Sequence, residues 1–452
     1  MHDAKVHFSE ACYFFTKEGH LMKTMFKLEE NGTTLHTEIR AGLTSFMAMA
    51  YIIFLNPVFL SAAGMNASGV LAATCLSAAL GTALSAFFSN KPFAMASGMG
   101  MNAYFTYTLC FGYGYTWQQA LALTFLAGLV FLVVALLVGK KAVTFIPENL
   151  RHAITAGSGL FILLIGLLDA GMIQMTAGFP ELGDIGSLPV ITSGLGLLVM
   201  AILTVLNVRG SLIIGMLITA AFSLLTKQTS LPDSLIALPT ALKEVSFQLD
   251  FSGLFHGSAS LATVLAVVLS MSIVDMFDTL GFLIGVTTKT SDYGCKPQQL
   301  DRILVADAGA TVIGALCGTS TVTVYAESAA GVEAGGRTGL TALTTACCFL
   351  LAVFFSPAAS IFSSAVTAPA LIMVGICLLM DIRKVQCDSM DDVIPAMLTV
   401  VIMPFAYSIT AGIAVGFISY LICKLTARKY QELNIPTYLI CLIFILYFCY
   451  NH

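Results

Sequence analysis

Charged residues are scarce in this sequence. Asp, Glu, Lys and Arg together make up 10% of the 452 residues, whereas about a quarter of an ordinary soluble chain is charged. Hydrophobic residues make up 58%, and the mean hydropathy is +0.90. Apolar runs of the roughly 20 residues needed to cross a bilayer recur from Ala41 to Leu425, and no polar block between them is large enough to fold alone. The composition therefore excludes a soluble domain and indicates a polytopic membrane protein.

The residue patterns that build metal and redox sites are missing as well. Most of the 12 cysteines fall within or at the ends of apolar runs, and none forms a C-x-x-C pair, so we interpret them as small apolar residues. The 7 histidines all fall in tails, loops or span ends, which excludes a histidine proton relay at the membrane centre. We expect no cofactor, no metal site and no nucleic acid as a partner.

The two end segments carry weaker signals. Residues 1–40 are polar with scattered lysines and lack the basic, apolar and small-residue order of a signal peptide. We expect them to form a cytoplasmic tail. The segment TYLICLIFILYFCY (437–450) is apolar but short for a span. It leaves two placements open, one at the membrane interface and one packed against the helix bundle.

The basic residues constrain the number of spans, which we predict to be about fourteen. With the N-terminus inside, all of the 21 Lys and Arg residues except Lys227 and Lys243 fall on the cytoplasmic side, as the positive-inside rule requires. Adding or removing one span would move several basic loops to the wrong side. We expect both termini in the cytoplasm and the protein in the plasma or inner membrane. The predicted spans are 41–63, 68–88, 92–110, 118–139, 152–170, 188–207, 211–226, 261–286, 303–318, 320–334, 340–355, 361–381, 391–406 and 408–425.

An even number of spans permits two halves of seven. Because seven is odd, the halves have opposite topology, which is the inverted repeat of many secondary transporters. Spans three and ten then occupy equivalent places. Each contains a glycine-rich stretch, MASGMGMNAYF (95–105) in one and TVYAESAAGVEAGGRTG (323–339) in the other.

These stretches predict two discontinuous spans. A glycine in a helix interior costs about 1 kcal/mol relative to alanine, and backbone freed from a helix at mid-membrane must be buried in protein or line a cavity. In transporters that cavity is the substrate site. TSTVTVY (319–325) is β-branched and aromatic, which favours extended chain, and Pro92 and Phe93 open the matching piece of span three. We predict two short antiparallel strands, each followed by a half helix; ordinary packing of small residues between helices is the alternative.

Acidic residues within the spans are the main candidates for chemistry, because a charge at the bilayer centre costs about 3 kcal/mol on insertion scales. Asp278 lies near the middle of span eight, and Glu327 directly follows the predicted strand of span ten. We favour these two as ligands of a substrate. Asp275 lies one helical turn from Asp278 and has a structural hydrogen-bonding role as its alternative, and Asp307 lies in span nine. No basic side chain at that depth neutralises these acids, so we expect at least one of them to bind and release a proton.

At these residues the sequence resembles a known family, the nucleobase:cation symporter 2 (xanthine/uracil permease) family, and within it the azaguanine-type branch of guanine, hypoxanthine and adenine permeases. The resemblance covers nearly the whole chain beyond the tail. It is carried by TEIRAGLTSFMAMAYIIFLNP (37–57), SGMGMNAYF, FDTLG, GTSTVTVYAESAAGVEAGGRTGLTAL and PAMLTVVIMPFAYSITAGIAVGF (395–417).

The resemblance implies an all-α membrane protein of about fourteen spans in two inverted seven-span repeats, with short strands in the broken spans three and ten. It also implies a core domain and a gate domain, a homodimer, and import of purine nucleobases by proton symport with alternating access. The corresponding boundaries are 1–40 for the tail, 41–145 and 259–357 for the core domain, 146–258 and 358–425 for the gate domain, and 426–452 for the C-terminal segment.

The resemblance also implies which residues hold the base. These are Asp278 in FDTLG, Glu327 in YAES, Asn102 in the span-three motif, and Tyr325 two residues before the span-ten acid. A carboxylate at Glu327 can accept hydrogen bonds from neighbouring N–H groups of a purine, while protonated Asp278 serves a second edge. Asn102 can read a carbonyl or a ring nitrogen.

Further candidates surround these four residues. Ser97 departs from the branch, which usually has proline before GMG. Main-chain N–H groups at Gly98 and Ser328, where the half helices begin, are expected to complete the polar ring. Tyr325 or Phe105 could cover the flat face of the base, with plain packing as the alternative for both.

The coupling ion and the class of function each have alternatives. Asp278 is our candidate proton carrier, with Asp275 or Asp307 as alternative relays, and a sodium-coupled transporter is a second possibility.

An anion transporter of the same architecture is disfavoured, because anions bind basic groups and helix N-termini whereas this site has acids. A channel would need a continuous polar pore. We expect no enzyme activity, because GMGMNA (98–103) matches a dinucleotide motif only formally, inside a span.

Overall fold

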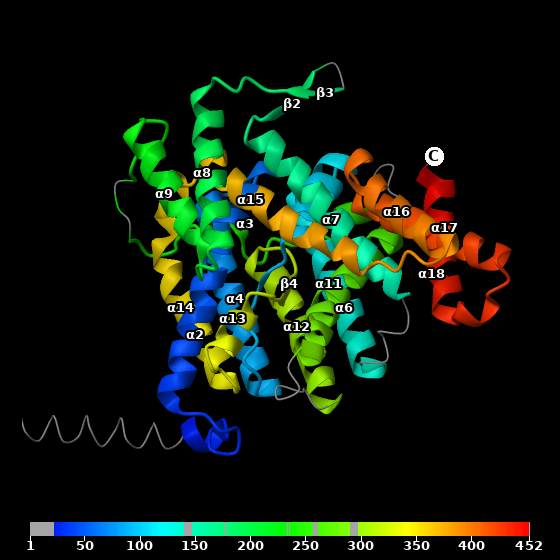
Figure 1. Ribbon diagram of the computed structural model, residues 1–452, viewed down its shortest axis with the longest axis horizontal. Coiled ribbons are helices and arrows are strands. Elements are labelled where there is room, and N and C mark those ends of the chain that lie inside the picture. Colours follow the sequence, from blue (N-terminus) through cyan, green and yellow to red (C-terminus); the bar gives the residue numbers. More distant parts are fainter. Residues whose placement is uncertain are drawn as a thin grey trace, which may run out of the picture.

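The computed structural model of the protein describes residues 22–139, 147–176, 179–232, 234, 236–255, 261–289 and 297–451 (Figure 1). Most of the predicted tail and the ends of several loops, including the core–gate boundary at 145, lie outside these residues. The described chain is largely helical, with two small two-stranded sheets.

The first half of the chain contains the seven predicted spans in order. Its elements are α2 (Leu35–Met49) and α3 (Ile52–Ala62) for span one, α4 (Ala67–Ser89), then β1 (Met95–Ser97), α5 (Met99–Ala103) and the π-helix η1 (Tyr104–Gly112) for span three, α6 (Trp117–Leu137), α7 (Glu148–Asp169), α8 (Leu188–Val205) and α9 (Ser211–Leu225).

The second half repeats this order. Its elements are α11 (Leu261–Lys289), α12 (Pro297–Cys317), β4 (Val322–Val324) with α13 (Ser328–Glu333) for span ten, α14 (Gly339–Ala352) with η5 (Val353–Ile361), α15 (Ser364–Leu379), α16 (Met390–Phe405) and α17 (Ile409–Thr426). Each predicted span is therefore matched by one helix or broken segment. Among the described residues, nine helical runs are long and apolar enough to cross a membrane, with α2 and α3, α14 and η5, and α15 and η6 each counted as one run.

Several short elements join these spans and were not predicted. A hairpin of β2 (Ile173–Thr176) and β3 (Phe179–Leu182) follows α7. The other connecting elements are α10 (Leu242–Val245), η3 (Ser252–Phe255), η6 (Met380–Lys384) and η7 (Tyr430–Glu432).

The apolar segment near the C-terminus forms a helix, α18 (Ile435–Asn451), that packs on α17 and α11. Cys441 Sγ donates to the Phe417 carbonyl oxygen at 3.3 Å, and the rings of Phe417 and Phe444 lie 6.0 Å apart. Of the two placements that the sequence left open, the structure therefore has the one packed against the bundle.

The two strands predicted from the glycine-rich stretches are present. β1 and β4 pair antiparallel, with Met95 opposite Val324 and Ser97 opposite Val322. Each strand is followed by a short helix, α5 or α13, as predicted. The half helix of span three continues as the π-helix η1, a rare conformation that is frequent at functional sites and that the sequence pattern did not predict.

Threonines from neighbouring spans satisfy the outer edges of this ribbon. Thr82 Oγ1 on α4 accepts from the Met95 N–H at 2.8 Å and donates to its carbonyl at 2.9 Å. Thr311 Oγ1 on α12 accepts from the Val322 N–H at 3.2 Å and lies 3.2 Å from the Val322 carbonyl oxygen. Thr82 precedes β1 by one span and Thr311 precedes β4 by one span, so the two halves use the same device.

Helix packing joins the elements into two groups. α12 packs against α4 and α6, and α14 packs against α2 and α4, whereas α7 packs against α15 and α16, and α8 packs against α9 and α15. The crossing of α7 and α15 is close, because a Cβ added to Gly159 would lie 2.5 Å from the Leu379 nitrogen.

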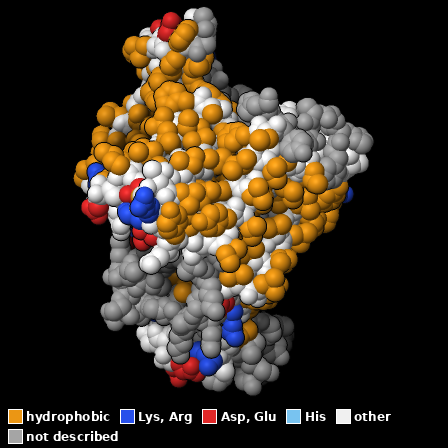
Figure 2. All heavy atoms as spheres, turned by 90° about the vertical axis from the view of Figure 1, so that its right-hand side faces the viewer, with side chains coloured by type: hydrophobic (Ala, Val, Ile, Leu, Met, Phe, Trp, Pro, Cys, Tyr) orange, Lys and Arg blue, Asp and Glu red, His pale blue; other side chains and the backbone are white. Residues whose placement is uncertain are grey.

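The outer surface fits a lipid environment. Figure 2 shows a face on which hydrophobic side chains form a broad surface and charged side chains gather in a few places. Large apolar side chains that are more than half exposed include Val133, Leu136 and Leu137 on α6 and Leu439 and Leu442 on α18. Such a surface is unusual for a soluble monomer and is what a multi-pass membrane protein presents to acyl chains.

Candidate substrate site

The candidate site lies where the β1–β4 ribbon meets the first turns of α5 and α13. The ribbon places Ser97, at the end of β1, opposite Val322, and the main-chain N–H of Tyr325, just after β4, donates to the Ala94 carbonyl at 3.0 Å. The buried Tyr325 hydroxyl donates to the Ser97 carbonyl oxygen at 2.5 Å. The two broken spans are thus joined through both main chain and side chains.

Glu327 immediately precedes α13 and is half-buried. Its Oε1 accepts a hydrogen bond from Tyr51 Oη at 2.5 Å, and Tyr51 lies at the break between α2 and α3. The rings of Tyr51 and Tyr325 lie 6.4 Å apart. Because a carboxylate has about four acceptor positions, Glu327 can bind Tyr51 and still accept from a ligand.

Asn102 is fully buried on α5, and its amide is held from one side. Asn102 Oδ1 accepts from Ser97 Oγ at 2.8 Å and from Ser320 Oγ. Its Nδ2 group lies 3.9 Å from Met99 Sδ, which is a weak acceptor. Since the carbonyl end of the amide is occupied, the N–H donors are the part available to a ligand.

A second set of polar side chains supports Asn102 from behind. Asn56 on α3 donates to Thr319 Oγ1 and to Thr74 Oγ1, both at 2.7 Å. Thr319 Oγ1 donates to Ser97 Oγ at 3.3 Å. Ser97 therefore orients Asn102, and β1 forms in register although the family branch usually has proline at this position.

The main-chain donors predicted at the half-helix starts already have partners. The Gly98 N–H donates to the Thr321 carbonyl at 3.1 Å, and the Ser328 N–H donates to the Tyr325 carbonyl at 3.1 Å. Ser328 Oγ also accepts from the Ala94 N–H at 3.0 Å. In this structure the Gly98 and Ser328 N–H groups therefore stabilise the ribbon and the turn after it, and each already donates to a main-chain carbonyl.

Asp278 lies on α11 beside the ribbon and is half-buried. The next residue, Thr279, is hydrogen-bonded through Oγ1 to Thr323 Oγ1 at 2.7 Å and accepts from the Val324 N–H at 3.3 Å. These contacts fix α11 against β4 at this level. Tyr325 lies within electrostatic reach of both Asp278 and Glu327, so the two favoured acids share one region.

Asp275 and Asp307 lie behind β4 and are almost fully buried. Asp275 Oδ2 accepts from Thr311 Oγ1 at 2.7 Å. Asp275 Oδ1 and both Asp307 oxygens have no hydrogen-bond partner among the described residues, and the two carboxyl groups interact with each other electrostatically. Two buried carboxyl groups that interact in this way are costly when both are charged.

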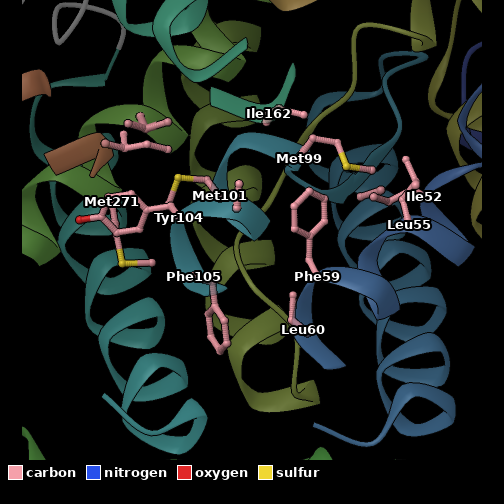
Figure 3. Packing of buried hydrophobic residues seen from close by; sticks show 14 of the residues in the cluster. Ile52, Leu55, Phe59, Leu60, Met99, Met101, Tyr104, Phe105, Ile162 and Met271 are labelled. Carbon is pink, nitrogen blue, oxygen red and sulfur yellow. The ribbon is translucent and has the colours of Figure 1, made fainter. Parts of the chain in front are cut away.

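Phe105 has a packing role. It is fully buried, and Figure 3 shows it among the apolar side chains of α3 and α5, with Phe59 and Leu60 nearby. Among the residues described, no cluster of three or more His, Cys, Asp or Glu side chains could hold a metal ion.

Comparisons with known proteins agree with this architecture. The sequence profile Xan_ur_permease, described as a permease family, matches residues 36–415. Guanine/hypoxanthine permease PbuO of Bacillus subtilis is 39% identical over 421 residues, covering 91% of this chain and 96% of that protein. Adenine permease AdeP of Escherichia coli is 36% identical over 433 residues, covering 94% and 95%.

A solved structure with little sequence identity shares the fold. The transmembrane domain of the cyanobacterial bicarbonate transporter BicA superposes with a TM-score of 0.63 at 16% identity, covering 87% of this chain and 97% of that one. This similarity supports the predicted arrangement of two inverted repeats.

Proposed function

Since this chain belongs to the permease family Xan_ur_permease, we propose that it imports purine nucleobases, hypoxanthine and guanine or adenine, by proton symport across the cell membrane. The observation that carries the proposal is that the two spans joined by the ribbon each contribute one polar group, and these groups have complementary roles. Glu327 presents a carboxylate held by Tyr51, and Asn102 presents amide N–H donors whose carbonyl is already bonded.

This pairing matches the edges of a neutral purine. The ring N1–H and the neighbouring 2-amino group of guanine, or the single ring N1–H of hypoxanthine, can donate to Glu327, and a purine carbonyl or imine nitrogen can accept from Asn102. Tyr325 and Tyr51 supply flat apolar surface on either side of the carboxylate. The names of the relatives, guanine/hypoxanthine permease and adenine permease, support purines as the substrate class.

Transport then requires the site to open to each side in turn. We propose that the core domain (41–145 and 259–357) moves relative to the gate domain (146–258 and 358–425), with the site between spans three, eight and ten. Asp278 would bind the coupled proton, and the buried pair Asp275 and Asp307 would relay it. An anion substrate would meet these acids without a compensating base, so the fold shared with BicA does not favour anion transport.

Uptake of radiolabelled hypoxanthine in cells without their own purine permeases tests the proposal. We expect uptake that guanine or adenine inhibits, that a protonophore abolishes, and that Glu327→Gln reduces at least tenfold, because the variant loses a charged acceptor. Glu181→Gln, an exposed acid on β3, is the matched control. Uptake that depends on a sodium gradient and is insensitive to the protonophore would show sodium coupling instead of proton coupling. Absence of purine uptake would show that the proposed substrate class is wrong.

A further inference from the structure

A cavity is lined by residues outside the ribbon. It has a volume of about 410 Å³ and is lined by Tyr107, Phe111 and Gly112 of η1, Ile165, Leu168 and Asp169 of α7, and Tyr407 of the turn between α16 and α17. Tyr107 is five residues beyond Asn102 on the same broken span. The cavity therefore lies toward one end of the span that carries Asn102, at the end of the molecule where few basic residues occur, which the positive-inside rule assigns to the outside.

Asp169 is the one acid in the lining, and its position does not suit helix stability. It is the last residue of α7, where the helix dipole already concentrates negative charge and disfavours a carboxylate. Asp169 is half-buried, and among the described residues none forms an ion pair or hydrogen bond with it. A half-buried carboxylate with open acceptor positions is suited to a ligand that carries N–H donors.

The aromatic side chains form the walls of the cavity. The rings of Tyr107 and Phe111 lie 5.7 Å apart and edge to face, and Phe161 meets both Tyr107 and Tyr407 in the same way. Flat aromatic surfaces beside one hydrogen-bonding group are typical of small-molecule sites, and the volume falls within the usual range for them.

Tyr407 occupies a position that glycine normally takes. It follows α16 with φ of +48°, and the Ser408 N–H donates to the Met403 carbonyl at 3.1 Å, as in a Schellman turn. A tyrosine in this left-handed conformation is strained. A functional role for the tyrosine ring in the cavity would explain why this strained residue is present.

We infer that this cavity is an encounter site that holds a neutral purine base before it reaches Glu327. The inference rests on the proposed function and adds a second binding site for the same substrate class. Asp169 accepts from ring N–H groups, and Tyr107 and Tyr407 contact the flat faces. Asp169 also repels phosphate, so the site selects free bases over nucleotides. Because η1 packs on α6 whereas α7 packs on α15 and α16, the two walls belong to different packing groups, and movement between those groups would open or close the cavity.

Transport kinetics and binding together test this inference. Asp169→Asn should raise the KM for hypoxanthine uptake about tenfold with little change in maximal rate, because one hydrogen bond to a charged acceptor is lost. Purified Glu327→Gln protein should keep weak binding of radiolabelled hypoxanthine in equilibrium dialysis, and the double variant with Asp169→Asn should lose it. The control is Asp184→Asn, at an exposed acid that follows the β2–β3 hairpin.

Tyr407→Gly separates a binding role from a structural one. Glycine relieves the positive φ but loses the edge-to-face contact with Phe161, so the melting temperature should change little while the KM rises. An unchanged KM in both Asp169→Asn and Tyr407→Gly, or equal residual binding in the single and double variants, would overturn the encounter site. If the wild type neither binds nor carries any purine, the proposed function is wrong, and so is the inference that this cavity binds a purine.

Discussion

Tyr51 positions the carboxylate on which the proposed mechanism depends. Its hydroxyl is the hydrogen-bond donor to Glu327 across a separation of 276 residues. Tyr51→Phe keeps the ring and removes this donor, so Glu327 loses its fixed orientation. We expect the KM for purine uptake to rise about tenfold, while the melting temperature changes little. Tyr438→Phe, on the exposed side of α18, is the control, and a KM equal to that of the wild type would show that Glu327 needs no partner.

Glu38 is a buried acid whose role is structural. Its carboxylate accepts from the main-chain N–H groups of Arg337, Thr338 and Thr341 and from both threonine hydroxyls at 2.7 Å. A carboxylate at the first turn of α14 is also favoured by the helix dipole.

Removal of this carboxylate should strongly destabilise the fold. Glu38→Ala leaves several buried donors without an acceptor, so we expect the free energy of unfolding to fall by about 3 kcal/mol or more. Thermal unfolding in detergent measures this, with the exposed Glu29→Ala as the control. Equal melting temperatures for the two variants would contradict the role of Glu38.

Sequence reasoning found some of the residues at the site and missed others for a physical reason. Glu327 and Asp278 stand out because a carboxylate in an apolar span is costly, and Asn102 stands out beside glycines. Tyr51 and Ser320 carry no such signal, since tyrosine and serine are common in spans and gain meaning only through a partner distant in the sequence. The N–H groups of Gly98 and Ser328 were predicted as ligand donors, but in the structure they donate to the main-chain carbonyls of Thr321 and Tyr325.

At the level of elements, the ribbon depends on two threonines outside it. Thr82→Val leaves the Met95 N–H and carbonyl without partners inside the protein, and Thr311→Val removes the partner of the Val322 N–H together with the hydrogen bond to Asp275. We expect each change to lower the free energy of unfolding by about 2 kcal/mol and to weaken purine binding, since Ser97 lies two residues along β1. Thr82→Ser and Thr311→Ser keep the hydroxyl and serve as controls. Valine variants as stable as the serine variants would show that water satisfies these edges.

The strands were predictable because β-branched residues and glycines mark where helix cannot continue. The π-helix η1 and the β2–β3 hairpin were not, since π-helical turns depend on tertiary packing and FPEL (179–182) contains a proline that weakens a strand assignment. Local sequence therefore predicts breaks in regular structure better than it predicts the conformation that follows them.

On the scale of the whole molecule, the charge pattern predicted the order of the fourteen spans, but it was silent on α18. Lys424, near the end of α17, is fully buried and forms ion pairs with Asp391, Asp392 and Glu432 at 2.5 to 2.9 Å. Glu432 precedes α18, so this cluster anchors the start of α18 at the end of α17 that basic residues place inside.

The other end of α18 lies at the opposite end of α17. Tyr447 is hydrogen-bonded through its hydroxyl to Tyr113 at 2.5 Å, just beyond η1, and in Figure 1 the C label lies toward the end that carries β2 and β3. A helix of 17 residues rises about 25 Å, close to the thickness of a bilayer core. Whereas the sequence predicts a cytoplasmic end after span fourteen, the packing of α18 predicts a further crossing that places Asn451 outside.

Reporter fusions decide between these two placements. Alkaline phosphatase fused after His452 should be active outside the cell, and green fluorescent protein fused there should stay dark in bacterial cells. The same reporters fused after Lys429, which removes α18, should give the reverse pattern, because Lys424 and Lys429 keep that end inside. A fluorescent fusion after His452 would show that α18 does not cross the membrane, and the contact between Tyr447 and Tyr113 would then have no place in the folded protein.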